Sequence, residues 1–151
     1  MKQYKIVIVE NDEDERFFIK LALEEFKHFQ ILGEFVNGDT LFEWLEKNRQ
    51  RLPDIILSDL NMPGKNGYDI LTFINSEPEL ERIPVIITST SPVIAVREKC
   101  LAMGAIEYMV KPEIFTDYCM YPIFQTAICC CISFFSSNSF HSKGVILPSP
   151  S

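Results

Sequence analysis

Polar residues of a few types end or follow the short apolar runs of this sequence, and together they could carry out phosphoryl chemistry. They are Glu10, Asn11 and Asp12 at one run, Asp59 and Asn61 at a second, Ser89 at a third and Lys111 at a fourth. Carboxylates that meet at one point repel each other unless a cation lies between them. Oxygen ligands without His or Cys suit a hard ion such as Mg²⁺, which also keeps room for phosphate oxygens. In such a site Asp59 would be the attacking carboxylate, and Lys111 would hold the acyl phosphate.

The elements that must position these residues are predicted by alternating β-branched runs and helical patterns. We predict strands at residues 5–10, 31–36, 54–60, 85–89 and 106–110, and helices at residues 14–28, 40–47, 68–75 and 93–103. This alternation implies right-handed crossovers and an α/β domain with a doubly wound parallel sheet. The ligand site of such a sheet lies at the carboxyl ends of its strands, where the polar residues converge.

Apolar spacing indicates which side chains form the core. Phe17, Phe18, Leu21, Leu23 and Phe26 recur at helical spacing in the first helix. We expect Trp44 and Cys100 to be core residues of two later helices. The acidic residues 13–15 are interpreted as the start of a helix, where they complement the helix dipole.

Composition and motifs exclude several other functions. The chain has 151 residues and a formal charge of −7, which opposes binding of nucleic acid by the chain alone. The sequence GKNG at residues 64–67 is no P-loop, because no strand precedes it directly and no Ser or Thr follows its lysine. Neither His28 nor His141 is placed to form a Ser-His-acid triad. The five cysteines are an odd number with three contiguous, which favours reduced thiols over a disulfide framework, and no signal-peptide core is present at the start, so a cytoplasmic location is expected.

Four segments carry a resemblance to a known family. They are VIVEND, SDLNMPGKNG, PVIITSTS and EYMVKP, and they occur in this order between residues 7 and 112. They resemble the bacterial response-regulator receiver domain of phosphorelay signalling, of the chemotaxis-regulator kind, over residues 4–112. The resemblance implies a flavodoxin-like, five-stranded parallel sheet with strand order 2-1-3-4-5.

The resemblance also implies a role for individual residues. Asp59 corresponds to the phosphoacceptor, and Lys111 to the lysine that precedes a proline typically on a cis peptide, here Pro112. Ser89, rather than Thr88, corresponds to the switch hydroxyl, because only Ser89 lies 22 residues before Lys111. Further positions are Tyr108 as the aromatic switch, Ser91 beside the attacking water, and Glu10, Asn11, Asp59 and the main-chain oxygen of Asn61 as Mg²⁺ ligands.

One of these positions departs from the family pattern. Asn11 stands where the family normally has a second aspartate that binds Mg²⁺ directly. An amide offers an oxygen but one negative charge fewer, so weaker metal binding and slower phosphorylation are expected. Asp12 is the substitute ligand that could compensate.

The function implied is that of a single-domain receiver. Asp59 would accept a phosphoryl group from a sensor histidine kinase or phosphotransfer protein, with Mg²⁺, and a surface switch would signal to a downstream protein. No enzymatic activity is expected beyond self-phosphorylation and slow autodephosphorylation, and no nucleic-acid or membrane partner; a homodimer is allowed. The alternative, suggested by Asn11, is a degenerate receiver that acts as a phosphorylation-independent interaction module.

The last forty residues differ from the rest of the chain. Residues 112–151 carry only Glu113, Asp117 and Lys143 as charged side chains. We expect the receiver domain to span residues 1–135, with an atypical last helix at 113–135, and residues 136–151 to be a disordered tail. Three alternatives stay open: a membrane span at 118–135 without basic anchors, a metal site at cysteines 129–131 without a partner at ligand spacing, and a segment altered relative to the family, for instance by a reading-frame change.

Overall fold

Five parallel strands and four helices make up the described part of the protein. The computed structural model describes residues 3–25, 27–111, 128–129 and 133. The elements are β1 (Tyr4–Val9), α1 (Glu13–Glu25), β2 (Phe29–Phe35), α2 (Gly38–Lys47), β3 (Ile55–Asp59), α3 (Gly67–Asn75), β4 (Val85–Ser89), α4 (Ile94–Ala102) and β5 (Glu107–Val110). The sheet has the order β2-β1-β3-β4-β5, and every pairing in it is parallel. The predicted fold class and strand order are confirmed.

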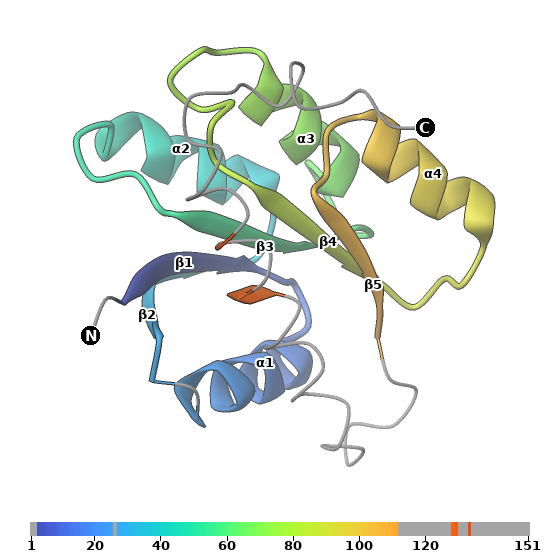
Figure 1. Ribbon diagram of the computed structural model, residues 1–151, viewed down its shortest axis with the longest axis horizontal. Helices are drawn as coiled ribbons and strands as arrows, with labels where there is room; N and C mark the ends of the chain where they lie inside the picture. The colour runs from blue at the N-terminus through green and yellow to red at the C-terminus, as the bar shows by residue number, and fades with distance from the viewer. Residues whose placement is uncertain (1–2, 26, 112–127, 130–132, 134–151) are drawn as a thin grey trace.

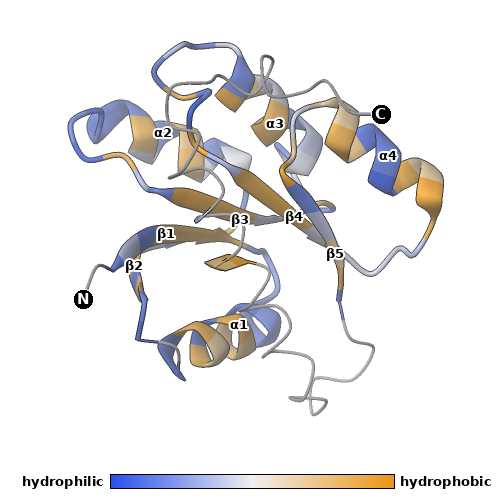
Figure 2. Ribbon diagram, in the orientation of Figure 1, coloured by the Kyte–Doolittle hydropathy of each residue, from blue (hydrophilic) through white to orange (hydrophobic). Residues whose placement is uncertain are grey.

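The helices cover both faces of the sheet. Figure 1 shows α1 on one face and α2, α3 and α4 on the other. Alternate residues of a strand point to opposite faces, so Ile6 and Ile8 pack with α1 while Val7 and Val9 pack with α2 and α3. The central strands β1, β3 and β4 are therefore covered on both faces, and they are hydrophobic along most of their length (Figure 2).

Three helices show the local signals that fix their ends. Asn37 caps α2 by accepting a hydrogen bond from Thr40 N, and Asn66 and Asp69 form a reciprocal capping box at the start of α3. After α4 the chain turns at Gly104, whose φ of +106° favours a residue without a Cβ atom. This turn is the predicted end of the fourth helix.

The packing of α1 differs from the prediction. Phe17 and Leu21 are exposed, whereas Ile19, Ala22 and Leu23 are the residues of α1 that are buried against the sheet. These three residues follow i, i+3, i+4 spacing and so define the inner face, which leaves Phe17 and Leu21 on the outer side. Phe26 lies outside the described residues.

The other core predictions agree better with the structure. Cys100 is fully buried between α4 and the sheet, as predicted for a small apolar side chain. Trp44 is half-buried, and the centroid of its ring lies 5.5 Å from that of Phe35. Trp44 therefore lies at the border of the core rather than inside it.

Most of the predicted last helix and tail lies outside the described residues, as does Pro112. The exceptions include Ile128, which is fully buried and packs in the same cluster as Ile6, Ile8 and Leu23. Cys129 packs against this cluster. Some part of the segment after residue 112 thus contributes to the core on the α1 face.

Candidate functional site

The candidate site is a group of charged side chains at the carboxyl ends of β1, β3 and β5. Asp59 is the last residue of β3, Glu10 follows β1 and Lys111 follows β5. The Nζ atom of Lys111 lies 2.7 Å from Oε1 of Glu10 and 3.0 Å from Oδ1 of Asp59. These three predicted residues, which lie far apart in the sequence, are therefore in contact.

Hydrogen bonds between the strand ends hold these residues in place. The backbone N–H of Lys111 donates to the carbonyl of Ser89 at 2.8 Å, and that of Glu10 donates to the carbonyl of Phe35 at 2.8 Å. The N–H of Leu60, directly after Asp59, donates to the carbonyl of Thr88 at 2.9 Å. The sheet ladder thus continues through the site, so the positions of the charged groups follow from strand register.

The loop after Asp59 is also closely fixed. The N–H of Gly67 donates to the carbonyl of Leu60 at 2.9 Å, and a Cβ atom at Gly67 would lie 2.9 Å from the main-chain oxygen of Asp59. Glycine therefore lets α3 start directly against the end of β3. Asn61 is exposed in this loop, where its main-chain oxygen was predicted to bind the metal.

Burial and charge set the ionisation of the three groups. Burial raises the pKa of Glu10 and that of Asp59, and the hydrogen bonds and positive charge of Lys111 oppose this rise. Burial alone would lower the pKa of Lys111, but its hydrogen bonds to carboxylates outweigh burial and raise it. Lys111 is therefore held as a cation, and its charge offsets only part of the rise, so the pKa of Glu10 and that of Asp59 both stay above their ordinary values.

Residues 10–12, the acidic segment after β1, make contacts that the sequence did not predict. Asp12 caps α1, because its Oδ1 atom accepts a hydrogen bond from Glu15 N at 2.9 Å, and its own N–H donates to Oε2 of Glu10 at 3.1 Å. Asn11 and Asp12 are exposed. Since the Asp12 carboxylate already serves as a helix cap, its predicted role as a substitute metal ligand would require it to leave this bond.

Glu15 belongs to the site, although its place in the sequence predicts only a residue of the helix start. Its Oε2 atom lies 2.5 Å from Nζ of Lys111. Arg16, the next residue, donates to the carbonyl of Glu10 at 2.7 Å and so ties the first turn of α1 to the end of β1. No sequence signal separates Glu15 from Glu13 and Asp14, because only the tertiary placement of α1 decides which of the three reaches Lys111.

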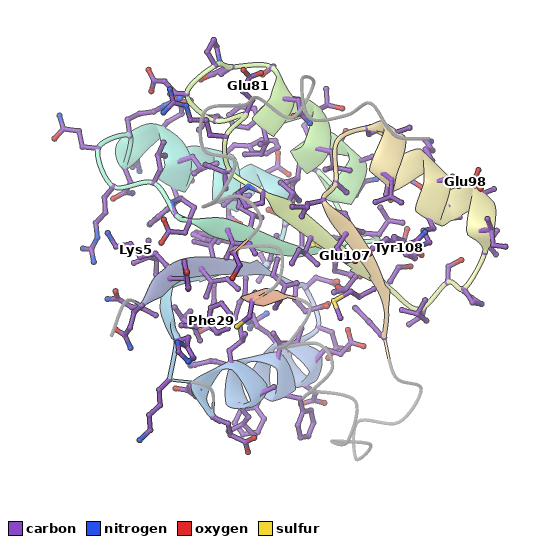
Figure 3. The ribbon with its side chains drawn as sticks, viewed as in Figure 1. Lys5, Phe29, Glu81, Glu98, Glu107 and Tyr108 are labelled. Carbon is purple, nitrogen blue, oxygen red and sulfur yellow. The ribbon has the colours of Figure 1, made fainter. Side chains whose placement is uncertain are left out.

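The two predicted switch residues lie on the neighbouring strands β4 and β5. Ser89 is buried, and its hydroxyl oxygen accepts a hydrogen bond from Ser91 N at 3.1 Å. Tyr108 is buried on the side of β5 toward α4 (Figure 3), and its hydroxyl donates to the carbonyl of Ser91 at 2.7 Å. Ser89 and Tyr108 thus meet through Ser91. Thr88, the alternative switch position, is buried with its hydroxyl 3.5 Å from the carbonyl of Ser58.

The donor set suits a hard cation. Two buried carboxylates, those of Glu10 and Asp59, share the contact with Lys111, and the adjacent predicted ligands are an amide side chain and a main-chain oxygen. All of these are oxygen donors, which Mg²⁺ prefers. Among the described residues no group of three or more His, Cys, Asp or Glu side chains is arranged to hold a metal ion.

The fold and the site together define a class of protein. It is the class of flavodoxin-like α/β domains that gather an aspartate, a second acid and a lysine at the carboxyl ends of the strands. Residues 6–118 match the family model of the response regulator receiver domain, and the chain belongs to this family. The resemblance inferred from the motifs is confirmed.

Individual relatives agree with this assignment. Over 111 residues the chain is 31% identical to the two-component response regulator-like protein PRR37 of Oryza sativa subsp. indica, covering 74% of this chain and 15% of that protein. It is also 31% identical to the phosphate regulon transcriptional regulatory protein PhoB of Rhizobium meliloti, covering 72% of this chain and 45% of that protein. The chain thus spans less than half the length of these two relatives.

A solved structure shows the same fold. The phosphorylated cyanobacterial phytochrome response regulator RcpA superimposes with a TM-score of 0.71 at 26% identity, covering 83% of this chain and 91% of that chain. Within the described residues no helix is both long enough and apolar enough to cross a membrane.

Proposed function

We propose that this chain is a receiver that accepts a phosphoryl group on Asp59 and signals by a change of its surface. The observation that carries the proposal is the contact of Lys111 with both Asp59 and Glu10, at 3.0 Å and 2.7 Å. An aspartate fixed at a strand end and opposed by an ammonium group is suited to in-line phosphoryl transfer, which depends on positioning and charge stabilisation.

The proposed reaction is a direct transfer. A carboxylate oxygen of Asp59 attacks the phosphorus of a phosphohistidine on a sensor histidine kinase or phosphotransfer protein. The new O–P bond forms as the P–N bond breaks, and the electron pair of that bond goes to the imidazole nitrogen, which takes a proton. Lys111 stabilises negative charge on the phosphoryl oxygens, since it lies beside the attacking carboxylate.

We propose Mg²⁺ as the metal of this site. Glu10, Asn11, Asp59 and the main-chain oxygen of Asn61 would hold it, and Asp12 would join only by leaving its cap on α1. When bound, the ion would neutralise charge on the transferring phosphoryl group. The two buried carboxylates support this assignment, because their mutual repulsion calls for positive charge beyond that of Lys111 alone.

The proposed output is a rearrangement near β4 and β5. A phosphoryl group on Asp59 would draw the Ser89 hydroxyl toward it, which breaks the bond from Ser91 N and frees Tyr108 to move with Ser91. A local change of charge would thereby alter a surface that a downstream protein binds. We propose a cytoplasmic protein without a nucleic-acid partner and without enzymatic activity beyond self-phosphorylation and slow autodephosphorylation.

The alternative is a degenerate receiver that binds partners without being phosphorylated. Asn11 favours it, because the site lacks one carboxylate at a position that the family normally fills with aspartate. Incubation with acetyl phosphate, with and without Mg²⁺, separates the two functions. The proposed receiver gains one phosphoryl group in a Mg²⁺-dependent manner, whereas a chain that stays unmodified at saturating Mg²⁺ is the degenerate module.

A further inference from the structure

Glu15 is the acidic residue of the site that the proposed reaction does not use. It lies in the first turn of α1, and its Oε2 atom is 2.5 Å from Nζ of Lys111. The cap formed by Asp12 and the bond from Arg16 to the carbonyl of Glu10 fix this turn against the end of β1. The contact is therefore placed by a rigid helix start.

Three carboxylates, including that of Glu15, surround the ammonium group of Lys111. An ammonium group has three N–H donors. Its three partners are Glu15 at 2.5 Å, Glu10 at 2.7 Å and Asp59 at 3.0 Å, so the phosphoacceptor has the longest of the three contacts. Glu10 and Glu15 accept hydrogen bonds from two of these donors and Asp59 faces the group as an ion pair, so a phosphoryl group on Asp59 competes with carboxylates for Lys111.

The phosphoryl group therefore competes most directly with the partner that is easiest to release. A phosphoryl group brings further negative charge and three strong acceptor oxygens. The side chain of Glu15 is 19% exposed, whereas those of Glu10 and Asp59 are 2% and 9% exposed. Leaving a buried carboxylate unpaired is costly, but Glu15 can turn to solvent and be hydrated, so it is the partner most easily released.

We propose that Glu15 is a positioning residue that competes with the phosphoryl group for Lys111 and is released from it when Asp59 is phosphorylated. This inference rests on the proposed function. In the unphosphorylated protein Glu15 holds the ammonium group toward α1, and it repels an anionic phosphodonor. Glu15 thereby slows phosphorylation of Asp59. The contact between the first turn of α1 and Lys111 then depends on whether Asp59 is phosphorylated.

The test is the rate at which acetyl phosphate labels Asp59 in Glu15→Gln. In the labelling step a carboxylate oxygen of Asp59 bonds to phosphorus while the bond from phosphorus to the acetate oxygen breaks, and acetate leaves with the electron pair. Gln keeps the shape of Glu but removes its charge, so we expect labelling to become about tenfold faster, the effect of a partly buried ion pair of about 1.4 kcal/mol. Each variant is assayed at a Mg²⁺ concentration that saturates it.

Two controls separate this role from general electrostatic or structural effects. Glu13→Gln removes the same charge from the same helical turn at an exposed position, and its labelling rate should equal that of the wild type. Glu15→Asp keeps the charge but is one methylene shorter, so it loses the contact with Lys111 and should label at a rate between those of the wild type and Glu15→Gln. A merely structural role would change the urea midpoint of the Glu15 variants without changing their labelling rate.

The outcomes distinguish this inference from the proposed function. Equal labelling rates in wild type and Glu15→Gln would overturn the role of Glu15 while leaving Asp59 as the phosphoacceptor. Equal acceleration in Glu13→Gln, or a wild-type rate in Glu15→Asp, would show that the contact with Lys111 is not the cause. A wild type that takes no label at all would overturn the proposed function, and this inference with it.

Discussion

At the scale of single residues, the candidate site is organised by the charge of Lys111. Three carboxylates surround its ammonium group, and each comes from a different part of the chain. With its carboxylates ionised this group carries a net negative charge, which is compatible with the proposed divalent cation although the group already contains a lysine. Asn11, directly after Glu10, is a neutral amide where the family pattern implies a negatively charged aspartate.

We predict that Asn11→Asp tightens Mg²⁺ binding. The change adds a full negative charge beside the proposed ion, and a gain of about tenfold in affinity is expected after screening by the waters that Mg²⁺ retains. Isothermal titration calorimetry with Mg²⁺ measures this affinity. Asp14→Asn, which alters charge at an exposed position of α1, is the control. Unchanged or weaker binding in Asn11→Asp would show that position 11 is not a ligand.

The proximity of Glu10, Asp59 and Lys111 could be predicted from the sequence, because each residue ends or follows a predicted strand. Parallel strands place such residues at one edge by topology alone. Glu15 could not be found in this way, since its contact depends on how α1 is rotated on the sheet. The same rotation explains why Phe17 was placed in the core by spacing although it is 56% exposed.

At the scale of elements, the junction between β3 and α3 fixes the position of Asp59, the proposed phosphoacceptor. Gly67 starts α3 so close to β3 that an added Cβ atom would lie 2.9 Å from both the main-chain oxygen of Asp59 and the Cα atom of Leu60. Both neighbours are backbone atoms and cannot rotate away. The start of α3 was predicted from the sequence to within one residue. The close approach of the backbones of β3 and α3 was not predicted.

We predict that Gly67→Ala destabilises the protein by about 1–3 kcal/mol, the usual range for overpacking, and slows labelling of Asp59. Both effects have one cause, because relieving the clash must shift the end of β3. Urea unfolding and the rate of labelling by acetyl phosphate measure them. Thr72→Ala, at an exposed position of the same helix, should leave both within error. Normal stability and rate in Gly67→Ala would mean that the junction is not constrained.

At the scale of the whole molecule, the sheet needs cover on the face where α1 packs. The buried residues of that face include Ile6, Ile8 and Ile86, and Ile128 is fully buried with them. The sequence predicted a covering segment after residue 112 because the family closes its sheet there. The unusual composition of residues 112–151 prevented a firmer assignment, since an uncharged stretch fits a buried helix and a membrane segment alike.

Two truncations test this cover. Deleting the residues after 135 should leave the receiver folded, because Ile128 is retained. Deleting residues 113–151 should expose the apolar face around Ile6 and Ile8 and cause aggregation. Circular dichroism and size-exclusion chromatography compare the two chains. A monomeric and equally stable chain ending at residue 112 would show that the segment is not needed as cover.

The most direct test of the account is the intact mass of the protein after incubation with acetyl phosphate and Mg²⁺. Three chains are compared: wild type, Asp59→Asn, and Asp54→Asn, which alters an exposed aspartate just before β3. We predict one added phosphoryl group on wild type and on Asp54→Asn, and none on Asp59→Asn. A phosphoryl group that persists in Asp59→Asn, or a wild type that stays unmodified at saturating Mg²⁺, would contradict it.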